Sequence, residues 1–215
     1  MARFKDRLRA GDTVSRATFE AGYGSASRIY EQADAHLGMT PAAYRRGGAG
    51  VRIRFATAST PLGWVLVAAT ERGVCAVRLG DDPATLVAGL RAEYPRADVA
   101  RADDALHRWV EGIVAYLNGA GRLPDAPLDL QATAFRWRVW KALQEIPHGA
   151  TRSYDEIATA IGAPDAARAV ANACASNPVA LLIPCHRVVR KDGSTSGYRW
   201  GPERKERLLR LEAEG

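Results

Sequence analysis

Two clusters of glycine and proline divide this 215-residue chain into three segments, and this division limits the folds that it can adopt. Gly47-Gly48-Ala49-Gly50 is typical of a flexible joint, and Leu123-Pro124-Asp125-Ala126-Pro127 is typical of a stiffer, extended connection. Hydrophobic residues make up 47% of the chain and charged residues 25%, which is ordinary for a globular protein and argues against global disorder. The sequence therefore predicts two compact units preceded by a short helical lead.

The first segment has helical patterns separated by glycines. One pattern covers residues 14–21, a second begins at Ser25 and ends at Gly38, and Thr40-Pro41 has the capping threonine and first-turn proline of a third. Helix, glycine turn and helix is the arrangement of a helix-turn-helix, whose second helix can enter a major groove. The same spacing also fits a plain helical hairpin.

The second segment reads as an α+β unit. Val51, Ile53 and Phe55 alternate with arginines, which is the period of a half-buried strand. Cys75 is most simply a buried strand residue. The remaining predicted elements are strands over 64–68 and 74–77 and helices over 83–93 and 104–118.

The third segment predicts four helices. A helix over 134–145 is followed by Ser153 and Glu156, which form a capping box for a helix ending at Gly162. Pro164 opens the next helix, to about residue 175, which is rich in alanine, so its backbone can approach a surface closely. Its one long basic side chain is Arg168, which is either a DNA contact or an ordinary surface arginine. A basic helix over 203–214 closes the chain.

The charge distribution favours a polyanion as partner. The formal net charge is +3 in residues 1–50, zero in 51–125 and +3 in 126–215. Basic ends suggest nucleic acid, although a solvated arginine-rich surface explains the charge equally well. Eight basic residues follow the alanine-rich helix, and only some of them can face a duplex at once: Arg187, Arg190, Lys191, Arg199, Arg204, Lys205, Arg207 and Arg210.

Composition also excludes several classes of protein. No apolar run approaches ~18 residues, which excludes a membrane span, and residues 1–10 lack the apolar stretch of a signal peptide. Cys75, Cys174 and Cys185 are too few for a disulfide framework or a four-cysteine zinc site. We therefore expect no bound metal and a reducing, cytoplasmic location.

Cys185 stands between two apolar runs, with His186 and Arg187 directly after it. A nearby positive charge, or a base that takes the proton, favours the reactive thiolate. Successive side chains of an extended chain point to opposite faces, so the pair requires a bend after Pro184 or a bridging water. The base would also need an orienting carboxylate. The candidates are Glu203, Glu206, Glu212 and Glu214. From composition alone, a structural cysteine beside a surface histidine is the commoner arrangement.

The hexapeptide Ile183-Pro184-Cys185-His186-Arg187-Val188 resembles the I-P-C-H-R-V active-site motif of the O6-alkylguanine-DNA alkyltransferases. The resemblance extends over residues 51–215. Ala166 to Val170 looks like the recognition helix of the family, and Asn177-Pro178 like its hinge. Ser196 to Gly201 is similar to the substrate loop of the bacterial adaptive-response (Ada-type) branch, and Leu208 to Glu212 to the terminal helix.

The lead segment resembles a part of Ada-type proteins as well. Residues 13–46, with Ala21-Gly22-Tyr23 and Gly38-Met39-Thr40-Pro41, are similar to the second helix-turn-helix of an AraC-type domain. Ada-type regulators also carry a four-cysteine zinc domain, which three cysteines cannot supply. We therefore expect repair rather than transcriptional activation from this chain.

The resemblance implies an α+β architecture with three parts. These are a partial AraC-type helix-turn-helix segment over 1–48, a small ribonuclease-H-like α/β domain over 51–122, and a winged-helix-like alkyltransferase domain over 128–215.

The function that the resemblance implies is DNA repair by a protein that consumes itself. Cys185 would accept the alkyl group of O6-alkylguanine, or of O4-alkylthymine, in double-stranded DNA and keep it as a thioether after a single turnover. His186 would take the thiol proton through a water, with Glu212 orienting the imidazole, and Asn177 would hold the turn. No cofactor is implied, and we expect a monomer.

The resemblance also assigns the residues that meet DNA. Tyr154 would crowd the phosphate 3′ of the target nucleotide, and Arg168 would fill the gap left by the rotated base, with Ala167 and Ala169 against the narrow minor groove. Tyr198 would offer a hydrogen bond near N3 of guanine.

Two other functions compete with this hypothesis. A DNA-binding regulator with vestigial chemistry need not keep a nucleophile at position 185, whereas this chain has one with a histidine beside it. A thiol hydrolase would turn over repeatedly, whereas the thioether of an alkyltransferase offers water no route of attack. Single turnover therefore separates a hydrolase from an alkyltransferase.

Overall fold

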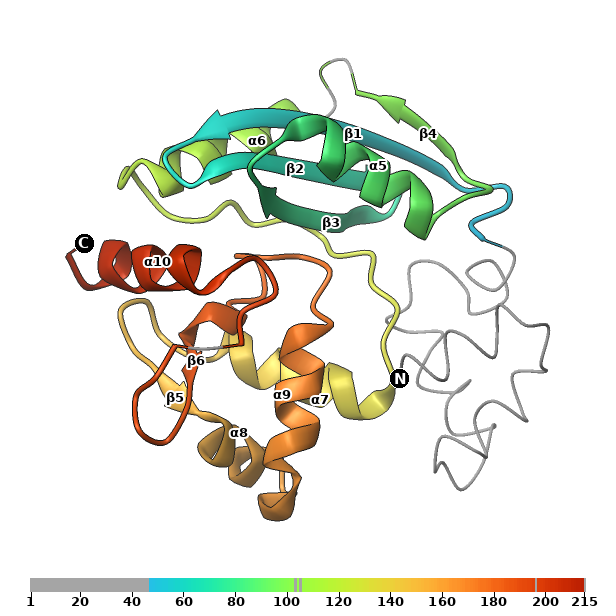
Figure 1. The fold of residues 1–215 in the computed structure, drawn as a ribbon. Coiled ribbons are helices and arrows are strands. Elements are labelled where there is room, and N and C mark those ends of the chain that lie inside the picture. Colours follow the sequence, from blue (N-terminus) through green and yellow to red (C-terminus); the bar gives the residue numbers. More distant parts are fainter. Residues whose placement is uncertain (1–46, 103, 105, 196, 215) are drawn as a thin grey trace, which may run out of the picture.

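The computed structural model describes residues 47–102, 104, 106–195 and 197–214, in two units that lie one above the other (Figure 1). The upper unit is a mixed sheet with two helices, and the lower unit is mainly helical. This arrangement confirms the predicted α+β class. The predicted helices of the lead segment fall in residues 1–46, outside the described residues.

The sheet of the upper unit has four strands in the order β3-β2-β1-β4. Its strands are β1 (Arg52–Thr60), β2 (Gly63–Thr70), β3 (Gly73–Gly80) and β4 (Asp98–Arg101). The first three pair antiparallel, and β4 pairs parallel with β1. Sequence analysis missed β4, because its four residues carry no run of apolar side chains and none of them is fully buried.

Two helices cover opposite faces of this sheet. Helix α5 (Pro83–Glu93) begins at Asp82, whose carboxylate accepts the Thr85 backbone N–H at 2.6 Å, and packs over Ile53 and Phe55. Helix α6 (His107–Leu117) covers the other face, where it packs against apolar side chains of β2 and β3. It is shorter at both ends than the predicted span of 104–118.

The lower unit contains the predicted helices. They are α7 (Ala134–Gln144), α8 (Tyr154–Ala160), α9 (Ala167–Ala175) and α10 (Pro202–Glu214). The capping box is confirmed, since Ser153 N–H donates to Glu156 Oε2 at 2.6 Å and Glu156 N–H to Ser153 Oγ at 3.2 Å. The helix expected from Pro164 starts later. Residues Pro164–Ala166 form a 3₁₀ turn (η1) instead, and α9 begins at Ala167 without a side-chain cap.

The lower unit also contains a small pairing beside the site. Strand β5 (Arg152–Ser153) pairs parallel with β6 (Val188–Val189), which follows the 3₁₀ turn η2 (Cys185–Arg187). This pairing connects the start of α8 to the turn that carries the cysteine. It therefore fixes Tyr154, the first residue of α8, relative to Cys185.

The outer edge of β3 is covered by two segments of the chain outside the sheet. The Val74 N–H donates to Pro127 O at 2.7 Å, and the Val77 N–H to Pro178 O at 3.0 Å. A Cβ atom at Gly73 would lie 2.2 Å from Pro127 O, so only glycine permits this approach. The second segment leads directly into the turn of Cys185, so the sheet helps to position the site.

Candidate active site

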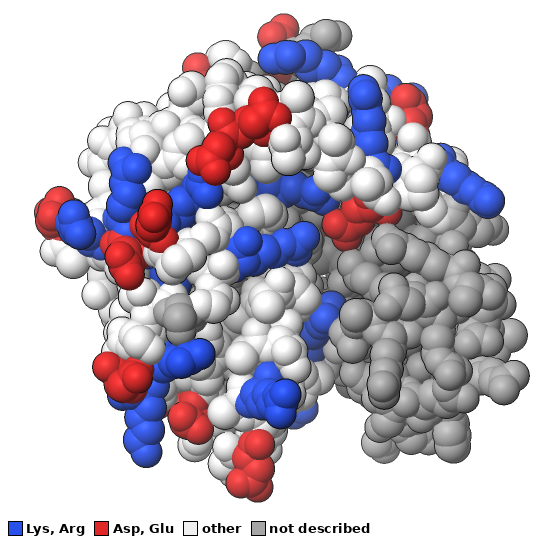
Figure 2. All heavy atoms as spheres, in the orientation of Figure 1, with Lys and Arg blue, Asp and Glu red and all other residues white. Residues whose placement is uncertain are grey.

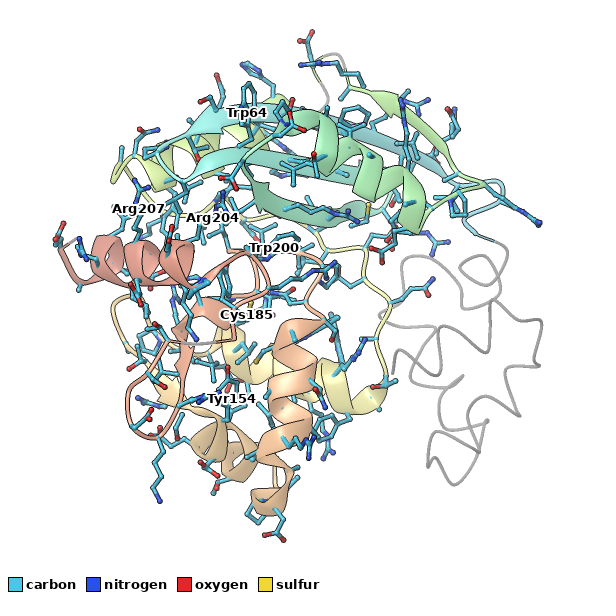
Figure 3. The ribbon with its side chains drawn as sticks, viewed as in Figure 1. Trp64, Tyr154, Cys185, Trp200, Arg204 and Arg207 are labelled. Atoms are coloured by element: carbon cyan, nitrogen blue, oxygen red, sulfur yellow. The ribbon has the colours of Figure 1, made fainter. Side chains whose placement is uncertain are left out.

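Cys185 is the first residue of the turn η2 and is 4% exposed. The Val188 N–H donates to Cys185 O, so the chain bends directly after Pro184, which was one of the two predicted alternatives. Figure 3 draws Cys185 between Tyr154 on α8 and Trp200 on the segment before α10. The thiol is therefore buried between the helices of the lower unit and the loop that precedes α10.

Asn177 fixes both the thiol and the loop around it. Its Nδ2 donates to Cys185 Sγ at 3.2 Å and to Ile183 O at 2.8 Å, and its Oδ1 accepts the Val179 N–H at 3.0 Å. The residue is 1% exposed, so these bonds do not compete with water. A donor on the sulfur stabilises the thiolate more than the thiol.

Burial and nearby charges act on the Cys185 thiol in opposite directions. Burial raises the pKa of Cys185, whereas the Asn177 hydrogen bond and the positive charge of Lys205 lower it. Lys205 is 1% exposed and donates from Nζ to Val188 O at 2.5 Å, and burial lowers its own pKa. Lys205 is a residue whose role at the thiol sequence analysis missed.

His186 and Glu212 form a buried pair beside the cysteine. His186 Nε2 lies 2.8 Å from Glu212 Oε1, and neither side chain is accessible to solvent beyond 1%. Glu212 raises the pKa of His186, but burial lowers it by more, so the neutral imidazole is favoured. If Nε2 carries the proton toward Glu212, Nδ1 is an acceptor. Among the described residues Nδ1 has no hydrogen-bond partner.

Glu212 also binds groups that sequence analysis did not assign to it. Arg187 donates to it from Nε at 2.8 Å and from Nη2 at 2.9 Å, and the Tyr116 hydroxyl of α6 donates to Oε1. Burial alone would raise the pKa of Glu212, but hydrogen bonds from His186 and Arg187 outweigh it and hold the pKa well below its usual range. Of the four glutamates considered, Glu212 is the one at His186.

Two tyrosines lie near the thiol. Tyr198 is 9% exposed, and its hydroxyl is buried without a hydrogen-bond partner among the described residues. Tyr154 is half-buried at the first position of α8. Burial raises the pKa of both hydroxyls, and the charge of Cys185 contributes to both shifts. The structure thus brings both predicted substrate-binding tyrosines toward Cys185.

Two of the three residues of the alanine-rich helix that were predicted to meet DNA are exposed to solvent. Arg168 and Ala169 of α9 are exposed, and Ala167 is half-buried. The opposite side of α9 packs Val170, Ala173 and Cys174 into the core. Arg168 is therefore free to meet a ligand from solvent.

Three of the eight basic residues that follow α9 are not available to phosphates, which corrects the sequence-based set. Arg187 is bound to Glu212 and Lys205 is buried. Arg204 donates to Leu62 O at 2.8 Å and forms an ion pair with Asp81. The exposed members are Arg190, Lys191, Arg199, Arg207 and Arg210. Figure 2 shows basic and acidic side chains interspersed on the visible face.

The described residues contain no group of three or more histidine, cysteine or acidic side chains that could hold a metal ion. They also include no helix long and apolar enough to cross a membrane.

Comparison with known proteins identifies both units. Residues 53–130 match the description "6-O-methylguanine DNA methyltransferase, ribonuclease-like domain", and residues 134–214 match "6-O-methylguanine DNA methyltransferase, DNA binding domain". The chain is 49% identical over 212 residues to the "Bifunctional transcriptional activator/DNA repair enzyme Ada" of Escherichia coli. The matched residues make up 99% of this chain and 60% of that protein. The chain thus spans about three fifths of the length of this relative.

Shorter relatives are covered almost completely. The chain is 41% identical to the methylated-DNA–protein-cysteine methyltransferase of Mycolicibacterium paratuberculosis, over 74% of this chain and 92% of that protein. The crystal structure of Mycobacterium tuberculosis OGT in complex with DNA has a TM-score of 0.65 and 38% identity, over 76% of this chain and 94% of that one. From sequence and fold together, we conclude that the chain belongs to the family of the methylated-DNA–protein-cysteine methyltransferases.

Proposed function

We propose that this protein repairs DNA directly, by moving the alkyl group of O6-alkylguanine, or of O4-alkylthymine, to Cys185 in a single irreversible turnover. The observation that carries the proposal is the surroundings of the sulfur. A buried thiol accepts a hydrogen bond from Asn177 and is followed by a histidine that is bound to a buried glutamate. These groups serve to make a thiolate and to take up its proton.

His186 is the proposed base. No hydrogen bond joins Cys185 and His186 among the described residues, so the proton passes through one water to Nδ1, the nitrogen opposite Glu212. Glu212 stabilises the imidazolium that results, and Asn177 stabilises the thiolate. Lys205 adds a buried positive charge next to the developing negative one.

The transfer itself needs no cofactor. The thiolate sulfur attacks the alkyl carbon, a carbon–sulfur bond forms, and the bond between that carbon and O6 breaks. The electron pair of the broken bond goes to the guanine, and a hydrogen bond from the Tyr198 hydroxyl near N3 compensates its charge. Water cannot hydrolyse the resulting thioether, so Cys185 remains alkylated.

DNA has to present the base outside the stack, because a buried thiol cannot reach it in a duplex. We propose that α9 lies in the minor groove, with Ala167 and Ala169 allowing a close approach and Arg168 replacing the extruded base. Tyr154 crowds the adjacent phosphate and promotes the rotation. Double-stranded DNA that contains O6-alkylguanine is therefore the proposed partner.

The remaining proposals concern organisation and location. We propose a ribonuclease-H-like domain over 51–122, an alkyltransferase domain over 128–215, and a partial helix-turn-helix segment over 1–48. We further propose that the protein acts as a monomer in the cytoplasm, where its three cysteines stay reduced. Transcriptional regulation, by analogy with Ada, is a weaker candidate that depends on residues outside the described part.

The test is incubation with a short duplex that contains one O6-methylguanine, followed by peptide mass mapping. One methyl group should appear on the Cys185 peptide, in a yield that never exceeds one per protein. Unmodified guanine in the same duplex is the control. Repeated turnover, or recovery of unmodified Cys185 with released methanol, would instead identify a hydrolase.

A further inference from the structure

We propose that Tyr116, a residue of the ribonuclease-like domain, is a positioning residue for alkyl transfer that acts on Cys185 through Glu212 and His186. The inference rests on the proposed function, because it extends the proton path described above. It gives the first domain a part in the chemistry of the second.

Tyr116 reaches the site across the boundary between the two domains. It lies on α6, is 3% exposed, and donates its hydroxyl hydrogen to Glu212 Oε1 on α10. Its ring packs against that of His148 in a T-shaped arrangement, with centroids 6.0 Å apart and planes at 83°. Burial, and then Glu212, raise the pKa of Tyr116, so at neutral pH the phenol is a protonated donor. The packing therefore holds a neutral donor on the carboxylate.

The Oε1 atom of Glu212 is shared by three donors. Besides the Tyr116 hydroxyl it is approached by His186 Nε2 at 2.8 Å and by Arg187 Nη2 at 2.9 Å. A carboxylate oxygen has two lone pairs, so three donors compete for its charge. Each donor stabilises the ionised carboxylate and reduces the charge that the others meet. Tyr116 thus limits how strongly Glu212 can hold a second proton on His186.

This limit matters because His186 must be neutral before it can accept the thiol proton. Its own burial favours the neutral form, and Glu212 favours the charged one. The charged groups that act on it are Glu212 and Lys205 on α10 and Arg187 on η2. Tyr116 on α6 reaches it through its hydrogen bond to Glu212. When the Tyr116 hydroxyl is lost, it no longer compensates part of the negative charge of Glu212, so the carboxylate attracts the proton of His186 more strongly. The imidazole then stays protonated to higher pH.

The first test is Tyr116→Phe, which keeps the buried ring and removes only the hydroxyl. The single-turnover rate of methyl transfer from an O6-methylguanine duplex is measured from about pH 5.5 to about pH 9. We expect the low-pH limb of the profile to move up by about one unit. On that limb the rate then falls by up to about tenfold, while on the plateau at higher pH it changes less than about twofold. The ¹⁵N NMR titration of the His186 imidazole should move in the same direction.

A second variant covers the case that Tyr116→Phe does not fold. Incorporation of 3,5-difluorotyrosine at position 116 keeps the hydroxyl but makes it a stronger donor, so the low-pH limb should move down instead of up. Tyr94→Phe is the matched control, because Tyr94 is a buried tyrosine of the same domain that packs on the opposite face of the sheet. Its pH profile should equal that of the wild type.

The His186→Gln background separates a role in the proton path from a structural one. Without an imidazole to tune, Tyr116→Phe should no longer shift the profile. An equal loss of rate at every pH, or an undiminished shift in the His186→Gln background, would overturn the proposal. If the wild type transfers no methyl group at all, the proposed function fails. The NMR titration of His186 still decides whether Tyr116 tunes it.

Discussion

His186 Nε2 and Glu212 Oε1 lie 2.8 Å apart in the core of the protein, although 26 positions separate the two residues in the chain. A pair that works as one base should lose its function when either member is removed. The double variant of His186→Gln and Glu212→Gln should therefore be little slower in methyl transfer than the slower single variant. Single-turnover rates of all four proteins check this expectation, and additive losses would refute the relay.

Cys185→Ala should abolish methyl transfer and leave binding to the duplex measurable, because the thiol supplies chemistry and no phosphate contact. The other two cysteines cannot replace it. Burial raises the pKa of all three thiols, that of Cys75 to about 12, but of the three only Cys185 accepts a hydrogen bond from Asn177 and has the His186–Glu212 pair beside it. Peptide mass mapping after incubation checks this result, and methyl on Cys75 or Cys174 would show that the wrong nucleophile is assigned.

Arg168→Ala should slow transfer from duplex DNA far more than transfer from a free O6-alkylated guanine base. In the proposed complex the exposed guanidinium fills the vacated stack, and a free base needs no extrusion. The ratio of the two second-order rate constants is the readout, with Arg207→Ala of α10 as a control for the loss of one exposed charge. Equal losses on both substrates would mean that Arg168 shapes the pocket instead.

Glu212 should make the fold sensitive to acid. Its folded-state pKa is depressed, so its contribution is complete above the ordinary carboxyl value of about 4.3 and is lost as pH falls through the folded-state value. Glu212→Gln should cost about 3–5 kcal/mol at neutral pH, because Arg187 loses a buried partner. The cost should shrink toward pH 3. Denaturant unfolding at both pH values measures it, and a pH-independent cost would contradict this assignment.

Binding to an unmodified duplex should depend on salt through the exposed arginines and lysine that follow α9. With about three to five phosphate contacts, log affinity should fall with log salt at a slope of roughly −3 to −4. Arg190→Ala or Arg210→Ala should reduce this slope. Lys205→Met should leave it unchanged, because Lys205 is buried.

Local signals in the sequence predicted those parts of the fold that depend on neighbouring residues. The capping box of Ser153 and Glu156 needs only a spacing of three, and both of its hydrogen bonds are present. The alternation of Ile53 and Phe55 likewise reports a sheet face directly. Strand β4 was missed because its pairing with β1 provides the stability that its own side chains do not.

The site depended more on contacts that are distant in sequence. The motif around Cys185 predicted the nucleophile and its neighbouring histidine. The spacing alone left four glutamates as partners for that histidine, the family resemblance singled out Glu212, and the fold places Glu212 Oε1 2.8 Å from His186 Nε2. Tyr116 and Glu212 are 96 positions apart, and no spacing rule connects them. Arg187 and Lys205 stood among the eight candidates for phosphate contacts because burial of a cation cannot be read from a basic segment.

The covered edge of β3 has a consequence for solubility. An uncovered edge strand is a template for pairing with another chain, and here Pro178 and Ala180 occupy that edge through hydrogen bonds to Val77. These residues belong to the same segment that carries Asn177 and continues into Cys185. Any event that displaces the segment exposes the edge, so the segment that positions the Cys185 thiol also keeps this edge from pairing with another chain.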